Sequence, residues 1–147
     1  GEKVLDLEMG KSVADLDPFV HCWHDVKDFA APMSSGSSLF DGMVIMPCTM
    51  GTLAAVANGI SANLIHRAAD VNLKERRPLI MVVRETPFNR THLQNMLTAH
   101  DAGAVICPAM PSFYHQPKSI AEMARAFAVR ICDQLDIAVP GVQRWGD

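Results

Sequence analysis

The sequence lacks several features that mark common protein classes. Its four cysteines are widely spaced, with neither a C-x-x-C pair nor the density of a secreted disulfide scaffold. No apolar run approaches the roughly 20 residues that a membrane-spanning helix needs. A net charge of -3 and a pI near 6.0 give no electrostatic reason to expect nucleic acid or an anionic membrane as a partner. We therefore expect a reducing, cytoplasmic setting and no membrane.

Several catalytic and metal-binding motifs are also missing. There is no G-x-S-x-G elbow, no Walker loop and no G-x-G-x-x-G turn, which weakens hydrolase, nucleoside triphosphatase and ordinary dehydrogenase interpretations. His21, Cys22 and His24 are ligand types, but strand alternation would place His21 on the opposite face from the other two. At most two could share an ion, so we expect no metal site.

Apolar residues are abundant, at 49% of the chain against 20% charged residues. The 147 residues fit one domain, residues 1–147, and we expect part of the apolar surplus to lie in subunit interfaces. From residue 43 onward, short β-rich runs alternate with longer helical patterns, which is typical of βαβ units around a parallel sheet. The strands are expected at 43–48, 78–83 and 104–109. Their near-continuous apolar character predicts interior strands.

Spacings of three and four between apolar residues predict the helices. Gly59 marks either a close contact or a kink inside the predicted helix Thr52–Asp70. Ser119 and Glu122 fit a capping box at the start of the predicted helix Ser119–Leu135. Before residue 43 the pattern is weaker. The helices are expected over Thr52–Asp70, His92–Ala102, Ser119–Leu135 and around Val4–Glu8, with a further strand near Phe19–Trp23.

In open parallel sheets, ligands bind beyond the carboxyl ends of the strands, so the loops there are the expected site. PCTMGT, 47–52, opens a helix whose N–H groups favour a nucleotide or flavin anion, although Thr49 acting only as a cap explains it equally well. Arg84 and Glu85 follow the second strand. They form either an isolated surface ion pair or a site in which a partly desolvated Glu85 acts as acid and base. SFYHQP displays Tyr114, the only tyrosine, whose phenol can donate to a phosphate oxygen.

Two further basic features stand out. The run HRAADVNLKERR, 66–77, contains Arg67 and Lys74, which would suit a phosphate if they faced a pocket, such as that of a neighbouring subunit. Spacing alone favours a solvated helix end. Arg130 is a lone charge among the apolar neighbours of AFAVRICD.

Taken together, these segments resemble the UbiX-type flavin prenyltransferases, within the wider group of FMN-binding homo-oligomeric flavoproteins. The resemblance runs from about Val4 to Trp145. It implies an α/β, flavodoxin-like three-layer sandwich with a parallel sheet, assembled as a homo-dodecamer of trimers with active sites between subunits. It rests on SSGSS, DGMVIMPCTMGTLAAVANGIS, NLIHRAADVNLKERRPLIMVVRETPF, HLQNML, GAVICPAMPSFYHQP and RWGD.

The front of the sequence departs from that family. Family members begin with a strand, a GASG-like turn that contributes to flavin phosphate binding, a helix and a second strand. None of these occurs in the first residues of this sequence. We therefore expect this sequence to be a fragment that lacks the first βαβ segment of the family.

The resemblance also implies an activity, which is the alkylation of reduced FMN by dimethylallyl phosphate at N5 and C6. The prenylated FMN would serve UbiD-type decarboxylases. Cations on the leaving group and an aromatic shelf for an allylic cation suit this chemistry without a metal. The implied residues are Thr49, Met50, Gly51, Thr52 and Arg84 for FMN, Arg67, Lys74, Tyr114 and Arg130 for the prenyl phosphate, and Glu85, Glu8, Ser35, Lys74 and Trp145 for catalysis.

Two other functions stay open from the sequence. One is a flavin-dependent cysteine decarboxylase of the same fold group, which shares the helix-opening loop but lacks the LKERRPL and SFYHQP segments. The other is a non-catalytic flavin-binding subunit.

Overall fold

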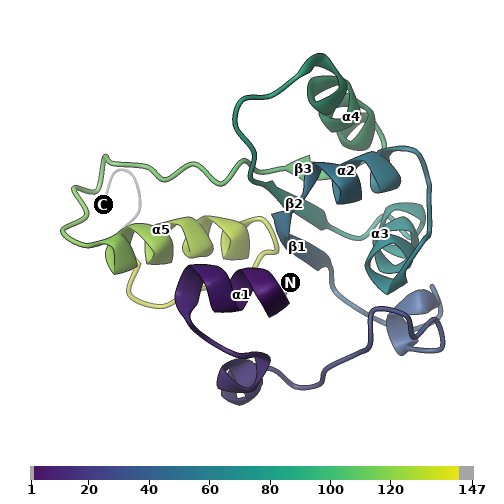
Figure 1. Cartoon of the computed structure of the whole chain (residues 1–147), viewed down its shortest axis with the longest axis horizontal. Helices are drawn as coiled ribbons and strands as arrows, with labels where there is room; N and C mark the ends of the chain where they lie inside the picture. The colour runs from purple at the N-terminus through teal and green to yellow at the C-terminus, as the bar shows by residue number, and fades with distance from the viewer. Residues whose placement is uncertain (1, 143–147) are drawn as a thin grey trace.

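The computed structural model describes residues 2–142 and has helices on both faces of a three-stranded parallel sheet (Figure 1). This confirms the predicted α/β, flavodoxin-like three-layer sandwich. The strands are β1 (Met43–Cys48), β2 (Leu79–Val83) and β3 (Val105–Ile106), in the order β1-β2-β3. The helices are α1 (Glu2–Met9), α2 (Met50–Ala57), α3 (Leu64–Lys74), α4 (Arg90–Asp101) and α5 (Ile120–Asp133), with 3-10 turns η1 (Val13–Phe19) and η2 (Pro32–Ser34).

Strand β2 is the centre of the sheet, and all five of its residues are buried. It pairs in parallel with β1 on one side and with β3 on the other, with Cys48 opposite Val83 at the carboxyl end of β1. Among the described residues, β1 and β3 are edge strands, so the prediction of three interior strands is correct only for β2. Met46 of β1 accordingly keeps 56% of its surface exposed.

The two faces of β2 pack against different helices. On one face, Met81 lies in a cluster with residues of α2, α3 and α4, among them Leu53, Ala69 and Ala99. On the other face, Ile80 and Val82 pack against Ile131 of α5. Burying each large apolar side chain contributes roughly 1.5–3 kcal/mol to folding. This packing fixes the sheet, and hence the positions of the loops at its carboxyl edge.

The helix predicted over Thr52–Asp70 is two helices, because the chain breaks between α2 and α3. Gly59 has a φ of +67°, a left-handed conformation that glycine adopts without strain. Asn63 then caps α3, its Oδ1 accepting from the His66 N–H at 2.9 Å. The alternative of a kink at Gly59 is therefore nearer to the structure, which shows a complete break.

The predicted strand near Phe19–Trp23 is wrong. Residues 13–19 form the η1 turn, with Pro18 inside it, and an irregular exposed segment follows. Alternating residues make a strand only where a neighbouring strand supplies hydrogen bonds, and Trp23 instead donates to Asp17 Oδ1 at 2.6 Å. Within residues 2–142, no group of three or more His, Cys, Asp or Glu side chains is placed to hold a metal ion.

The other predicted helices are confirmed, as α1, α4 and α5. At the start of α5, Ser119 Oγ accepts from the Glu122 N–H at 3.1 Å, as the predicted cap requires. The Glu122 carboxylate accepts from the Lys118 N–H, so the reciprocal half of the capping box is not formed with Ser119. None of the helices in the described part of the chain has the length and apolar character to cross a membrane.

The single chain exposes much apolar surface. Its accessible area is 10132 Å², whereas a compact monomer of 16.0 kDa exposes roughly 7,400 Å². Leu93 and Leu97 lie one turn apart on α4, and each has more than half of its surface exposed. Leu39, Phe19 and Ile120 are exposed above 80%. An assembly of several chains would bury such a surface.

Candidate functional site

The turn between β1 and α2 exposes the start of a helix at the carboxyl edge of the sheet. Thr49 is the N-cap of α2, and its Oγ1 accepts from the Thr52 N–H at 3.2 Å. Thr49 therefore caps the helix, and this role leaves room for a ligand. The first backbone N–H groups of a helix have no acceptor within that helix, so those of Met50 and Gly51 are oriented to bind an anion.

Gly51 has no evident role in the fold of this chain. A Cβ atom at this position would meet only Thr49 Oγ1, at 4.0 Å, among atoms outside its immediate surroundings. Its backbone is helical, so no left-handed conformation requires a glycine. A glycine that the fold does not need is consistent with the close approach of a ligand to the backbone.

Cys48 lies beside this turn and is fully buried. Burial raises the pKa of its thiol from 9.0 to about 11, an effect that a hydrogen bond with the Leu53 backbone only partly offsets. Because the thiolate is the reactive form, a thiol that stays protonated at neutral pH is a poor nucleophile. Cys48 is therefore a packing residue.

Arg84 and Glu8 meet at the end of β2, although they come from distant segments. Arg84 Nη2 donates to Glu8 Oε1 at 3.1 Å, and both side chains are slightly more than half exposed. Arg84 thus pairs with Glu8 of α1, and the predicted alternative of an isolated Arg84–Glu85 pair is wrong. The structure instead brings together two residues that the sequence assigned to the site.

Glu85 is exposed, and its Oε1 accepts from the N–H of Thr86 at 3.0 Å. The partial desolvation that the sequence analysis invoked for this carboxylate is therefore not provided by the described residues of one chain. As the second residue after β2, it still lies next to Arg84 in the sequence, at the carboxyl edge of the sheet.

A second group of predicted residues gathers where the 34–37 loop packs against α3. Arg67 Nε donates to the Ser34 carbonyl at 3.0 Å, and its Nη1 pairs with Asp70 Oδ2 at 2.9 Å. Lys74 pairs with Glu75, and hydrogen bonding to Lys74 is the main cause that lowers the pKa of the Glu75 carboxyl. Ser35, Arg67 and Lys74 therefore share one corner of the molecule.

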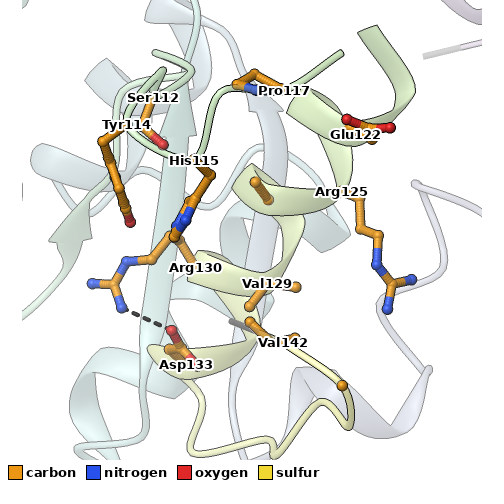
Figure 2. A pocket seen from close by; sticks show the side chains of 12 residues that line it. Ser112, Tyr114, His115, Pro117, Glu122, Arg125, Val129, Arg130, Asp133 and Val142 are labelled. Atoms are coloured by element: carbon orange, nitrogen blue, oxygen red, sulfur yellow. Dashed lines mark hydrogen bonds and ion pairs between the residues drawn. The ribbon is translucent and has the colours of Figure 1, made fainter. Parts of the chain in front are cut away.

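A cavity of about 600 Å³ lies between the loop after β3 and helix α5 (Figure 2). Tyr114 and Arg130 both line it, and Figure 2 shows the hydroxyl end of Tyr114 directed toward the guanidinium of Arg130. Arg130 Nη1 pairs with Asp133 Oδ2 at 2.8 Å, and the ring of His115 lies 3.9 Å from that of Tyr114 between centroids. A phenol and a guanidinium at one cavity are suited to bind a phosphate.

The four residues predicted to hold one prenyl phosphate lie in two places. Arg67 and Lys74 belong to α3 and its end, whereas Tyr114 and Arg130 lie at α5, on the opposite face of the sheet (Figure 1). Within the described part of one chain they do not form a common site. That sites are completed between subunits stays a prediction. The predicted catalytic residue Trp145 lies outside the described residues.

Two residues that contact these groups were not predicted from the sequence as site residues. Asp133 pairs with Arg130 from three positions along α5, and Arg77 Nη2 donates to the Gly36 carbonyl at 2.7 Å. The spacing of Arg130 and Asp133 was a signal, since residues three apart share a helix face. Nothing in the sequence links Arg77 to Gly36, which lies 41 positions away.

Comparison with known proteins gives concordant matches. The model of the Flavoprotein family matches residues 2–129. The flavin prenyltransferase UbiX of Deinococcus radiodurans is 50% identical over 144 residues, which cover 98% of this chain and 74% of that protein. The crystal structure of AnUbiX in complex with FMN and dimethylallyl pyrophosphate has a TM-score of 0.95 at 41% identity, covering 99% of this chain and 78% of that chain. A dodecameric FMN-dependent UbiX-like decarboxylase from Escherichia coli O157:H7 has a TM-score of 0.93 at 38% identity, covering 99% and 79%.

Proposed function

Because the chain belongs to the Flavoprotein family and, within it, to the UbiX flavin prenyltransferases, we propose that it transfers a dimethylallyl group from dimethylallyl phosphate to N5 and C6 of reduced FMN. The observation that carries the proposal is the register of the sheet. Cys48 and Val83 are partners on neighbouring strands, so Thr49 and Arg84, which directly follow them, emerge side by side at the carboxyl edge. That edge is where ligands of open parallel sheets bind.

In this proposal FMN lies at the β1–α2 turn. The N–H groups of Met50 and Gly51 and the hydroxyl of Thr52 provide donors, and the absence of a side chain at Gly51 admits the ligand to the backbone. Arg84 adds a positive charge from the adjacent strand end. FMN supplies the nucleophilic ring atoms, while these protein groups orient it.

The prenyl phosphate lies in the cavity next to Tyr114 and Arg130. A departing phosphate gains negative charge, and fixed cations and hydroxyl donors stabilise it more strongly than water does. Arg67 and Lys74 of a neighbouring subunit complete this set, which accounts for their distance from Tyr114 within one chain. Trp145 offers its aromatic face to the allylic cation.

Proton handling falls to Glu85, with Ser35 and Glu8 as further catalytic groups. Glu85 lies beside Arg84 at the expected flavin edge, within the part of the molecule that a neighbouring subunit could cover. Such a cover would supply the desolvation that this chain alone does not, and desolvation raises the pKa of a carboxyl toward the range useful for proton transfer.

Assembly, recipient and compartment are part of the same proposal. The exposed apolar surface supports a homo-oligomer, and we propose a dodecamer because one of the similar crystal structures is dodecameric. The prenylated FMN is handed to a UbiD-type decarboxylase. The four free thiols support a reducing, cytoplasmic compartment.

The test is an anaerobic incubation of the purified protein with reduced FMN and dimethylallyl monophosphate, followed by mass spectrometry of the flavin. The expected product is FMN carrying one added prenyl group, and a parallel arm with the diphosphate identifies the donor. No adduct in either arm would refute the proposal. A cysteine-terminated peptide tests the alternative decarboxylase, whose expected signature is loss of carbon dioxide. Bound flavin without any turnover would indicate a non-catalytic flavin-binding subunit.

A further inference from the structure

Ser35 lies between two peptide groups that are each held by an arginine, one in the first half of α3 and one three residues after its end. On one side, Arg67 Nε donates to the Ser34 carbonyl at 3.0 Å. On the other, Arg77 Nη2 donates to the Gly36 carbonyl at 2.7 Å. Hydrogen bonds from a charged donor are roughly twice as strong as neutral ones. The backbone on both sides of Ser35 is therefore anchored to α3 and to the segment that directly follows it.

The glycine in this loop shows how closely the loop approaches Lys74. A Cβ atom at Gly36 would lie 2.5 Å from Lys74 Nζ and would overlap the carboxylate of Glu75. The loop therefore contacts the Lys74–Glu75 pair directly, through a position where only a glycine leaves that pair undisturbed.

The backbone of Arg77 is hydrogen-bonded to a buried residue. Its backbone N–H donates to the carbonyl of Asn72, and Asn72 is only 5% exposed. The Asn72 side chain in turn donates to the Ala68 carbonyl at 2.7 Å. Because the Arg77 backbone is held in this way, its side chain reaches the loop from a fixed point of the main chain.

The Ser35 hydroxyl is also oriented from within the loop. Its Oγ lies 2.8 Å from Ser37 Oγ and accepts from the Ser37 N–H at 3.3 Å. The loop is thus fixed by its own hydrogen bonds and by the two arginines. A loop that only connected η2 to β1 would not need charged donors on both sides of one serine.

We infer that Arg77 is a positioning residue of the prenyl-transfer site. Together with Arg67 it clamps the peptide groups on either side of Ser35, and so holds that serine at the Lys74 end of α3. The inference rests on the proposed function, in which Ser35 and Lys74 take part. It also gives Arg67 a second role besides binding the prenyl phosphate, because its Nε holds the Ser34 carbonyl and its Nη1 is paired with Asp70.

The first test compares Arg77→Gln with Arg76→Gln. Arg76 is the adjacent, exposed arginine, so its variant removes the same charge while leaving the clamp intact. Hydrogen–deuterium exchange of residues 30–42 is expected to accelerate in Arg77→Gln and to stay unchanged in Arg76→Gln. This readout needs no substrate and therefore tests the clamp independently of the activity. Equal exchange in the two variants would overturn the inference.

The second test measures prenyl transfer. Arg77→Gln is expected to lower kcat about 10- to 100-fold with FMN affinity within about two-fold of the wild type, since misplacement of a catalytic group costs rate on this scale. Arg77→Lys, which keeps the charge and one donor direction, is expected to recover part of the loss. It also serves as the working variant if Arg77→Gln does not fold. An unchanged kcat in both variants would contradict a positioning role.

A double-mutant cycle separates positioning from a general structural effect. If Arg77 acts through Ser35, then Arg77→Gln should slow a Ser35→Ala background by less than two- to three-fold. Full additivity would show that Arg77 acts elsewhere and would overturn the inference. Failure of the proposed function looks different, because the wild type itself would then form no prenylated flavin while the exchange experiment would still report on the clamp.

Discussion

Arg84 and Glu8 are 76 positions apart in the sequence, and their side chains meet with Nη2 of Arg84 donating to Oε1 of Glu8 at 3.1 Å. Both are more than half exposed, and ion pairs of this kind contribute at most about 1 kcal/mol to stability. The position that the pair gives to the Glu8 carboxylate therefore explains it better than its contribution to the stability of the fold. It brings a carboxylate from α1 to the strand end where we propose that FMN binds.

Replacing Glu8 by glutamine should separate these two effects. Glu8→Gln keeps the size and an acceptor oxygen but removes the charge, so the free energy of unfolding should change by less than about 1 kcal/mol. Prenyl transfer should slow by about 10-fold or more if the carboxylate takes part in catalysis. Chemical denaturation and product formation by mass spectrometry measure the two quantities.

The matched control for Glu8 is Asp6→Asn, which removes a carboxylate from the same exposed helix two positions earlier. It should leave the rate within about two-fold of the wild type. Equal rates for both variants and the wild type would remove Glu8 from the mechanism.

Glu85→Gln tests the assignment of the proton-handling group. The Glu85 Oε1 accepts from Thr86 N–H, and the amide oxygen of glutamine can keep that hydrogen bond, so the loop should be preserved. FMN binding, followed by flavin fluorescence, should be retained while prenyl transfer slows. Unchanged turnover would exclude Glu85 as the acid or base.

The strands and most helices were predictable because local patterns decide them. Residues 78–83 read as a buried strand since both faces of β2 are covered, and Ser119 identified the start of α5 by its capping chemistry. The break at Gly59 was harder to predict, because the apolar spacing continues from α2 into α3 across the turn. The spacing of apolar residues indicates which side chains face inward, but it does not indicate where a helix ends and the next begins in another direction.

The site was predictable residue by residue but not in its arrangement. The motifs identified Arg67 and Tyr114, but their placement on opposite faces of the sheet depends on how α3 and α5 pack. In the same way, the partner of Arg84 is Glu8 because the chain folds α1 back toward β2, a contact between residues too distant for any local spacing to reveal.

Gly51→Ala distinguishes a glycine needed by a ligand from one needed by the fold. A Cβ atom at Gly51 has open space and alanine favours helices, so stability should stay unchanged or rise by up to about 1 kcal/mol, while FMN affinity should fall. Gly42→Ala is the contrasting variant. Its Cβ atom would lie 2.9 Å from the Pro78 carbonyl oxygen, and it should cost about 1–3 kcal/mol. Unfolding and flavin titrations measure both effects, and unaltered flavin affinity in Gly51→Ala would contradict the assigned role.

Arg130→Gln tests the phosphate site at the cavity. Removing the guanidinium should raise the KM for dimethylallyl phosphate at least 10-fold, because a charged donor to the phosphate is lost, while FMN affinity should stay the same. Arg125→Gln removes the same charge from the same helix. Arg125 lines the same cavity, but Figure 2 shows its side chain extending away from Tyr114 and Arg130. Its KM should rise much less, and equal increases in the two variants would indicate only a general electrostatic effect of α5.

Cys48 predicts a pH dependence of stability whose sign follows from its burial. Burial raises the pKa of the folded thiol to about 11, whereas the unfolded thiol ionises near 9.0. Below pH 9 both states hold the proton, and the contribution of Cys48 to stability is fully present. As the pH rises toward 11 only the unfolded state loses its proton, so the stabilisation is lost. The difference in unfolding free energy between the wild type and Cys48→Ala should therefore shrink by roughly 1–3 kcal/mol between about pH 8 and 11. Cys22→Ala, at an exposed thiol, is the control, and its difference in unfolding free energy from the wild type should not change with pH in this way. Parallel curves for the two variants would contradict the effect of burial on Cys48.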